Sequence, residues 1–246
     1  MSEQFIKTHV QDHVQIIELD RVDKKNAINN DMYTRLRTML EDGDANTDVR
    51  VILIRGKGNV FTAGNDLGDF NNRPKNGPSK GHLFLRTLHR VKKPLIAQVE
   101  GLAIGIGVTL LLHCDLVYAA SNARLRLPFV NLGICPEAGS TLLLPQKAGH
   151  RAASELFLLG DYFTPEEAKE HGIVNRILPP DDIHDFVWEQ AQKLVQQNPQ
   201  AVMETKRLMK AHLQDATTDQ IEAEAITFNR LLQSDASKTA RKETLK

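Results

Sequence analysis

Backbone N–H groups at a glycine-rich turn are the first candidates for chemistry in this sequence. The stretch from Glu100 to Asp115 (EGLAIGIGVTLLLHCD) carries three glycines among apolar residues, Gly101, Gly105 and Gly107. The pattern predicts a short buried strand over 94–99, a glycine turn, and a buried helix over 108–112. The first N–H groups of a helix have no partner within the helix and carry partial positive charge. Such a turn is suited to stabilising a developing oxyanion.

A plainer interpretation of the same glycines stays open. Small residues also let a helix pack closely on a sheet, and a lone glycine pattern does not separate the two roles. A nucleotide P-loop is excluded because no Gly-Lys-Ser/Thr follows the turn. A dinucleotide fingerprint fits poorly, because its glycine spacing differs and no acidic residue ends a second strand about 20 residues further on.

Composition describes an ordinary globular chain. Of its 246 residues 41% are hydrophobic and 25% are charged, and the formal net charge is zero. A neutral chain has no general attraction to nucleic acid or to membrane surfaces, and no apolar run approaches the length that spans a bilayer. The two cysteines, Cys114 and Cys135, are too few for a disulfide framework and lack the spacing of metal ligands. With a polar N-terminus, these features predict a cytoplasmic protein without a metal.

The remaining elements predict an α/β core followed by helices. Asp31 is expected to cap a helix that ends at Gly43, and Ser140 to cap a later one. The polar stretch 71–80, rich in Pro and Gly, is expected to be a mobile loop. The composition changes at Pro179 and Pro180, which predicts a core over 1–178 and a helical region over 179–246.

A second glycine-bearing loop, FTAGNDL (61–67), follows the strand predicted over 49–54. This loop and the AIGIGVTLLLHCDL segment together resemble the crotonase (enoyl-CoA hydratase/isomerase) superfamily. The resemblance covers nearly the whole chain, and further matching segments are KNAI (25–28), KPLIAQVEG (93–101), LGICPEAGSTLLLP (132–145), FTPEEAKEHGIVNRIL (163–178) and ETK (204–206). It implies a spiral of repeated ββα units with a C-terminal helical region that forms trimers, alone or in pairs.

The resemblance also implies the chemistry of the two loops. A coenzyme A thioester would be bound as substrate, with no separate cofactor, and two backbone N–H groups would stabilise the enolate formed on its carbonyl oxygen. By position these donors are the N–H groups of Asn65 and Ile106. The resemblance places the following residues at the substrate and coenzyme A: Lys25, Ala27, Lys57, Ala63, Gly64, Asn65, Asp66, Leu67, Gly105, Phe129 and Leu132. Lys24, and more weakly Lys206, are further candidates for the phosphates, although each lysine is equally typical of a solvated surface.

Acid–base residues must decide which reaction is catalysed. The two glutamates of the family's hydratases are replaced here by Thr109 and Phe129, neither of which is a usable base near neutral pH. Glu137, in the sequence Pro-Glu-Ala-Gly, resembles the single glutamate that peroxisomal-type Δ3,Δ2-enoyl-CoA isomerases carry in a Pro-Glu-Gly context. A carboxylate in an apolar pocket formed by Phe129, Leu132 and Ile134 would be a stronger base. The alternative is that Glu137 only favours a helix start.

Three functions therefore remain open. The leading prediction is a 3-enoyl-CoA to 2-enoyl-CoA isomerase with Glu137 as base, acting in fatty-acid oxidation. The second is a hydratase-like or other crotonase-type reaction on an acyl-CoA. The third is a catalytically silent acyl-CoA-binding protein. The expected partners are the acyl-CoA and further copies of the chain, as a homotrimer or hexamer, and neither nucleic acid nor membrane.

Overall fold

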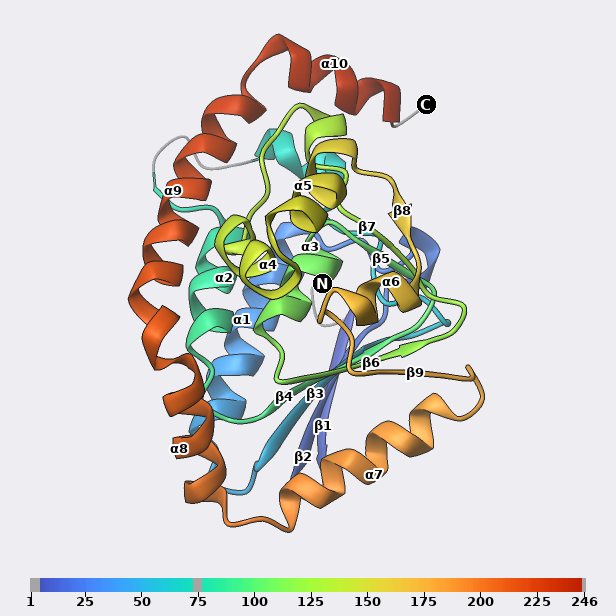
Figure 1. Cartoon of the computed structure of the whole chain (residues 1–246), viewed down its shortest axis with the longest axis vertical. Coiled ribbons are helices and arrows are strands. Elements are labelled where there is room, and N and C mark those ends of the chain that lie inside the picture. Colours follow the sequence, from blue (N-terminus) through green and yellow to red (C-terminus); the bar gives the residue numbers. More distant parts are fainter. Residues whose placement is uncertain (1–4, 73–76, 245–246) are drawn as a thin grey trace.

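The computed structural model describes residues 5–72 and 77–244, arranged around one central sheet (Figure 1). The order of the six strands is β1-β2-β3-β4-β6-β9, in which β1 and β2 are antiparallel and the other pairs are parallel. A second sheet has the order β5-β7-β8. The strands are β1 (Ile6–Gln11), β2 (Val14–Leu19), β3 (Val51–Gly56), β4 (Leu95–Val99), β5 (Leu102–Ile104), β6 (Leu116–Ala120), β7 (Arg124–Arg126), β8 (Tyr162–Phe163) and β9 (Arg176–Leu178).

Helices surround the central sheet. They are α1 (Asn30–Ala45), α2 (Lys80–Arg90), α3 (Ile106–Thr109), α4 (Ser140–Ala148), α5 (His150–Leu159), α6 (Pro165–Glu170), α7 (Ile183–Val195), α8 (Pro199–Lys210), α9 (Gln214–Leu232) and α10 (Asp235–Thr244), with short 3-10 turns that include η4 (Leu110–His113) and η5 (Val130–Leu132). Figure 1 shows α8 and α9 forming a long arm along one side of the molecule, with α10 across its end. The predicted alternation of strands and helices followed by a helical region is confirmed.

Both faces of the central sheet are covered, which explains why its strands are almost wholly apolar. Alternate residues of β2 point to opposite faces: Val14 and Ile16 pack in one buried cluster with α7, whereas Ile17 and Leu19 belong to the main core with α1. Helix α7 therefore packs on the sheet, although it lies beyond the predicted boundary at 178. The division of the chain at that point stays a prediction.

Two details of α1 differ from the prediction. Its N-cap is Asn29, whose side-chain oxygen accepts from the Met32 N–H at 2.9 Å, and Asp31 lies in the first turn. The helix also continues through Gly43, where a Cβ atom would lie 1.8 Å from the Oε1 atom of Gln15. Gly43 thus permits close packing of the helix on β2 and does not end it. The predicted loop 71–80 includes residues 73–76, which lie outside the described residues.

Replacing Gly101, at the start of the central glycine turn, tests how tightly the backbone is packed there. Its φ is +57°, and a Cβ atom there would lie 2.2 Å from the Asn59 carbonyl oxygen. We expect Gly101→Ala to lower the free energy of unfolding by roughly 3 kcal/mol or more, measured by urea denaturation, because backbone atoms must move. Gly172→Ala is the matched control: its φ is +69° but the nearest atom, the Lys147 Cβ, is 4.0 Å away. A loss near 1 kcal/mol is expected there, and equal losses would contradict the steric explanation.

Candidate active site

The two glycine loops lie side by side. Thr62 and Ala103 form a parallel bridge, and the Ile104 N–H donates to the Thr62 carbonyl oxygen at 3.0 Å. Gly64, with a φ of +91°, passes so close to β5 that a Cβ atom there would lie 2.7 Å from the Ile104 carbonyl oxygen. Only glycine permits both this backbone angle and this approach. The FTAGNDL loop is therefore held against the strand that leads into the second loop.

This contact puts the loop that carries Asn65 beside the strand that leads to Ile106. Within residues 5–72 and 77–244, the N–H groups of Asn65 and Ile106 donate to no backbone or side-chain acceptor. Ile106 is the first residue of α3, and the sharp change of direction falls on Gly105, with φ +56° and ψ −113°. Ile106 itself is helical, so a residue with a side chain fits where the family commonly has glycine. Two N–H groups at such a turn can stabilise a developing oxyanion by donating hydrogen bonds to it.

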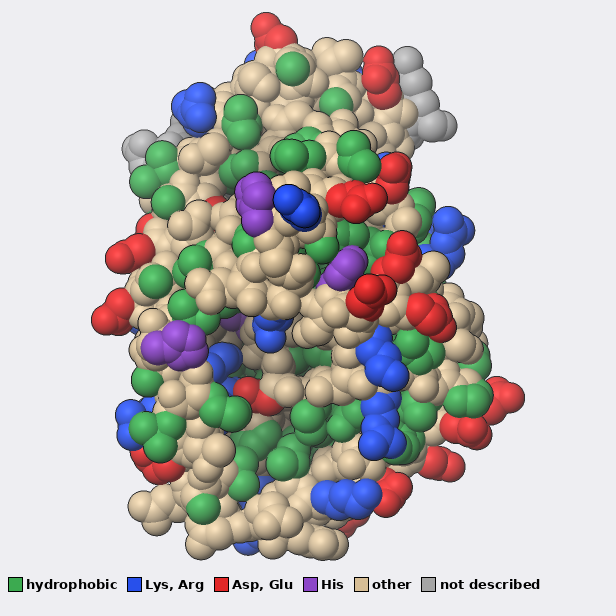
Figure 2. All heavy atoms as spheres, viewed as in Figure 1, with side chains coloured by type: hydrophobic (Ala, Val, Ile, Leu, Met, Phe, Trp, Pro, Cys, Tyr) green, Lys and Arg blue, Asp and Glu red, His purple; other side chains and the backbone are tan. Residues whose placement is uncertain are grey.

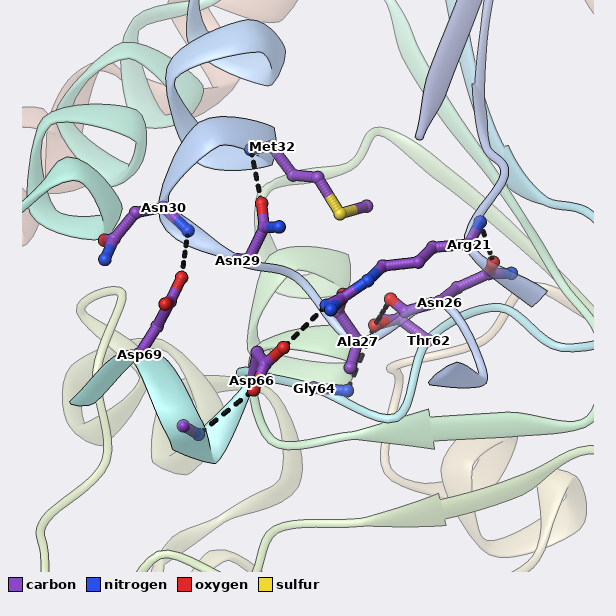
Figure 3. A network of polar contacts seen from close by, with 11 residues as sticks. Arg21, Asn26, Ala27, Asn29, Asn30, Met32, Thr62, Gly64, Asp66 and Asp69 are labelled. Carbon is purple, nitrogen blue, oxygen red and sulfur yellow. Dashed lines mark hydrogen bonds and ion pairs between the residues drawn. The ribbon is translucent and has the colours of Figure 1, made fainter. Parts of the chain in front are cut away.

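A polar network fixes the FTAGNDL loop to the turn that precedes α1 (Figure 3). The guanidinium of Arg21 donates to the Ala27 carbonyl oxygen at 3.0 Å and to the Asp66 carboxylate at 2.7 Å. The Thr62 hydroxyl donates to the Asn26 carbonyl oxygen at 2.7 Å and accepts from the Gly64 N–H at 3.0 Å. These contacts give the Asp66 side chain a structural role and hold the neighbouring N–H of residue 65 in place.

The side chain of Asn65 connects the oxyanion loop to Glu137. Its Nδ2 atom donates to the Glu137 Oε1 atom at 3.2 Å, and its Oδ1 atom accepts from the Tyr33 hydroxyl at 2.5 Å. The Glu137 carboxylate only accepts hydrogen bonds, so the Asn65 amino group must face it, and the amide oxygen then accepts from the Tyr33 hydroxyl. One residue thereby places the predicted base beside a predicted oxyanion donor. Glu137 is half-buried, at the turn before α4.

The turn carrying Glu137 has unusual backbone geometry. Ala138, directly after it, has a φ of +71°, a left-handed conformation that costs a non-glycine residue on the order of 1–2 kcal/mol. The Ala138 carbonyl oxygen accepts from the Nε2 atom of His113 at 2.7 Å. The predicted Ser140 cap is wrong, because the helix starts at Ser140 after Gly139 and the Ser140 side chain makes no capping bond. Glu224 of α9 accepts from the Gly139 and Thr141 N–H groups instead, at 2.6 and 2.9 Å.

Burial shifts the pKa values of both groups that hold this turn. Burial lowers the pKa of the His113 imidazole to about 3, so the ring is neutral near pH 7 and its Nε2 atom carries the donated hydrogen. Burial raises the pKa of the Glu224 carboxyl to about 7, opposed by its hydrogen bonds to Thr141 and Gly139. A neutral imidazole can stay in the interior, and the Glu224 carboxylate is stabilised there by the Gly139 and Thr141 groups that donate to both of its oxygens.

The positions of the hydratase glutamates are closed to water. Thr109 is fully buried, and within the described part of the chain its hydroxyl has no hydrogen-bond partner. Phe129 is 3% exposed, and its ring tip lies 3.9 Å from where a Cβ atom on Gly105 would be. Ile134 is buried and Leu132 packs against the same core, and the predicted apolar pocket around Glu137 stays a prediction.

The candidate phosphate-binding lysines differ in how exposed they are. Lys24 and Lys25 lie exposed at the turn before α1, and Lys57 pairs with Asp20 at 2.9 Å while staying 48% exposed. Lys206 is 5% exposed, and its ammonium group donates to the Asp115 carboxylate at 2.6 Å and to the Lys93 carbonyl oxygen at 2.7 Å. The prediction that Lys206 contacts a phosphate is wrong, because its ammonium group is buried in the ion pair with Asp115.

The comparisons with known proteins agree with this geometry. The model of the Enoyl-CoA hydratase/isomerase family matches residues 9–246. The chain is 34% identical to the 2,3-dehydroadipyl-CoA hydratase of Escherichia coli over 203 residues, 81% of this chain and 79% of that one. It is 35% identical to the enoyl-CoA delta isomerase 2 of Rattus norvegicus over 202 residues, 79% of this chain and 51% of that one. The structure of Pseudomonas aeruginosa OdaA superimposes with a TM-score of 0.95 at 39% identity, covering 98% of this chain and 99% of that one.

The chain belongs to the enoyl-CoA hydratase/isomerase family and has the crotonase fold. Hydratase and isomerase names both occur among its relatives, so family membership establishes an acyl-CoA-processing enzyme and leaves the reaction open. Within the described residues, no helix has both the length and the apolar character needed to cross a membrane.

Sequence reasoning missed the residues that support the site from a distance. Arg21, Tyr33, His113 and Glu224 each contact a loop of the site from another element. Their partners lie between 25 and 85 positions away in the chain. The one usable signal was His113, which ends an otherwise apolar run.

The buried His113 should make the free energy of unfolding fall as the pH is lowered. In the unfolded chain the imidazole binds a proton below about pH 6.5, whereas in the folded chain its pKa is about 3, so the unfolded state binds more protons as the pH falls. Between pH 7 and pH 5 this group alone should lower the free energy of unfolding by about 2 kcal/mol. We expect His113→Gln to reduce the pH dependence measured by urea denaturation by that amount. Equal slopes for wild type and His113→Gln would contradict the assignment.

Proposed function

We propose that this enzyme converts 3-enoyl-CoA to 2-enoyl-CoA thioesters, with Glu137 as the only acid–base group. The observation that carries the proposal is the contact of 3.2 Å between the Glu137 carboxylate and Asn65, the residue whose N–H is an oxyanion donor. A base adjacent to the oxyanion site lies beside C2 of a thioester whose carbonyl oxygen occupies that site. The relatives named as delta isomerases support the same reaction.

The reaction needs one base used twice. The carboxylate of Glu137 removes a proton from C2, and the electron pair moves onto the thioester oxygen, which the N–H groups of Asn65 and Ile106 stabilise. The same carboxyl group then returns the proton to C4, and the double bond becomes conjugated with the carbonyl. The amino group of Asn65 donates to the carboxylate and keeps it oriented between the two carbons.

Hydration is the weaker alternative. It requires an activated water and a second acid–base group, but the two positions concerned hold Thr109, which is fully buried, and Phe129, which has no proton to exchange. The catalytically silent acyl-CoA-binding protein remains the second alternative, since the oxyanion donors alone would bind a thioester.

The coenzyme A moiety is proposed to lie along the turn before α1 and the FTAGNDL loop. Lys25 and Lys57 are exposed there and could meet the phosphates, and the backbones of Ala27 and Ala63 are joined to the same network. A cytoplasmic location is part of this proposal.

Glu137→Gln tests the reaction. We expect the variant to lose isomerisation of trans-3-hexenoyl-CoA, followed by ultraviolet absorbance, by about 10²–10⁴-fold in kcat/KM, since general base catalysis contributes that much. Binding of hexanoyl-CoA, measured by calorimetry, should persist because the oxyanion donors are backbone groups. The exposed Glu155 of α5 supplies the control, Glu155→Gln, which should retain full activity. Rapid hydration of crotonyl-CoA by the wild type would contradict the proposal, and binding without any turnover would favour the silent protein.

We also propose that the chain forms a homotrimer or a pair of trimers. Large apolar side chains are exposed on the C-terminal helices: Leu208 is 63% exposed, Met209 62% and Ile226 72%. A groove of about 430 Å³ lies beside Met209 and is lined by Leu116, Leu194 and Val202. Figure 2 shows hydrophobic side chains gathered in a hollow in the lower half of this face. An apolar surface of this kind is typical of an interface between protein chains.

If the chain forms a trimer or a hexamer, light scattering should give a molar mass of three or six times the 27.6 kDa of one chain. Replacing Leu208 and Ile226 together by Lys should shift the population toward monomer, because burying a lysine in an apolar interface is unfavourable. As a control, the same change at the exposed Leu158 of α5 should leave the assembly unchanged. A monomeric wild type would rule the assembly out.

A further inference from the structure

The turn Glu137-Ala138-Gly139 adopts a conformation that its own sequence does not favour. Ala138 and Gly139 are both left-handed, with φ values of +71° and +68°. Glycine adopts this conformation freely, whereas alanine does so only when surrounding contacts hold it there. Ala138 is 1% exposed, so water contributes nothing to holding the turn.

A carboxylate from another helix holds the turn on its C-terminal side. The Oε2 atom of Glu224 accepts from the Gly139 N–H at 2.6 Å, and its Oε1 atom accepts from the Thr141 N–H at 2.9 Å and the Thr141 hydroxyl at 2.5 Å. Glu224 is 4% exposed on α9. It supplies the cap that α4 lacks, since the Ser140 hydroxyl is buried without a hydrogen-bond partner among the described residues.

The neutral His113 holds the other side of the same residue. Its Nε2 atom donates to the Ala138 carbonyl oxygen, so the two ends of the single peptide group between Ala138 and Gly139 are held by side chains from η4 and α9. This peptide group directly follows Ala138, the residue after Glu137. A change of the Ala138 φ or ψ would therefore move Glu137 relative to a fixed peptide group, and with it the contact of its carboxylate with the Asn65 amino group.

We propose that Glu224 is a positioning residue that keeps the Glu137 carboxylate against Asn65 by locking the left-handed turn at Ala138. The inference rests on the proposed function for its kinetic consequence, but its structural consequence is independent of which reaction is catalysed. Glutamine is the sharpest replacement, because it keeps the volume but offers one acceptor and one amino group to a pair of backbone N–H donors. One of the Gly139 and Thr141 N–H groups would then face another donor.

Glu224→Gln should lower kcat for trans-3-hexenoyl-CoA by about 10–100-fold while KM changes less than about threefold, because the base is displaced and the thioester still binds. Glu222→Gln is the matched control on the same helix. Glu222 pairs with Arg86 at 2.6 Å and with His82 at 3.1 Å, both on α2, so its replacement should leave both constants unchanged. A wild-type kcat in a folded Glu224→Gln variant would overturn the inference.

A second substitution separates positioning from a general loss of stability. Ala138→Gly removes the need to hold an alanine in the left-handed conformation. The double variant Ala138→Gly/Glu224→Gln should therefore recover most of the lost kcat, although it restores none of the hydrogen bonds of Glu224. If the double variant recovers no activity, the conformation of Ala138 is not the cause of the lost kcat.

If Glu224→Gln does not fold, Thr141→Val provides a milder test. It removes one of the three contacts of Glu224 and should lower kcat by about 3–10-fold; an unchanged kcat would count against the inference.

A crystal structure of Glu224→Gln gives a readout without turnover. We expect the Ala138 φ to leave the left-handed region and the contact between Asn65 Nδ2 and Glu137 Oε1, now 3.2 Å, to be lost. An unchanged turn would overturn the inference whatever the reaction. A wild type that does not isomerise 3-enoyl-CoA, with a displaced turn in the variant, would instead refute the proposed function and leave the positioning role supported.

Discussion

The close approach of Gly64 to the Ile104 carbonyl oxygen is the constraint on which the site depends. Where a Cβ atom would be 2.7 Å from a backbone oxygen, no side chain fits, so the FTAGNDL loop and β5 meet at backbone distance. That contact holds the loop that carries Asn65 beside the strand that leads to Ile106. The proposed oxyanion donors are backbone groups of these two segments, and the hydrogen bonds of the segments limit how far the N–H groups can move.

Hydrogen bonds of buried polar side chains connect these two loops to the surrounding elements. Arg21 ties the loop to the turn before α1, and Tyr33 orients the Asn65 amide toward Glu137. His113 and Glu224 hold the turn after Glu137. A buried polar group is costly unless its partners are present, so each of these contacts allows only one arrangement of its loop. The catalytic geometry proposed here therefore also depends on side chains other than the proposed base and the residues that supply the oxyanion donors.

Much of the fold could be predicted because it is encoded locally. The buried strands are apolar runs in the sequence, and the capping box at the start of α6 is formed by Thr164 and Glu167, only three positions apart. The predictions failed where packing between distant elements decides. Gly43 was expected to end a helix but makes room for Gln15, and Ser140 was expected to cap one but leaves that role to Glu224.

The sequence by itself determined the two glycine loops, the absence of the hydratase glutamates, and the single candidate base at Glu137, because glycine geometry and side-chain chemistry are properties of individual residues. Only the tertiary structure decided that Asn65 touches Glu137, 72 positions later, and that Glu224 reaches Gly139 across 85 positions. It also decided that Lys206 is buried in an ion pair with Asp115 rather than exposed to a ligand. Hydrogen bonds and ion pairs between distant residues have no local pattern in the chain, since they form only when the packing of helices on the sheet brings their partners within reach.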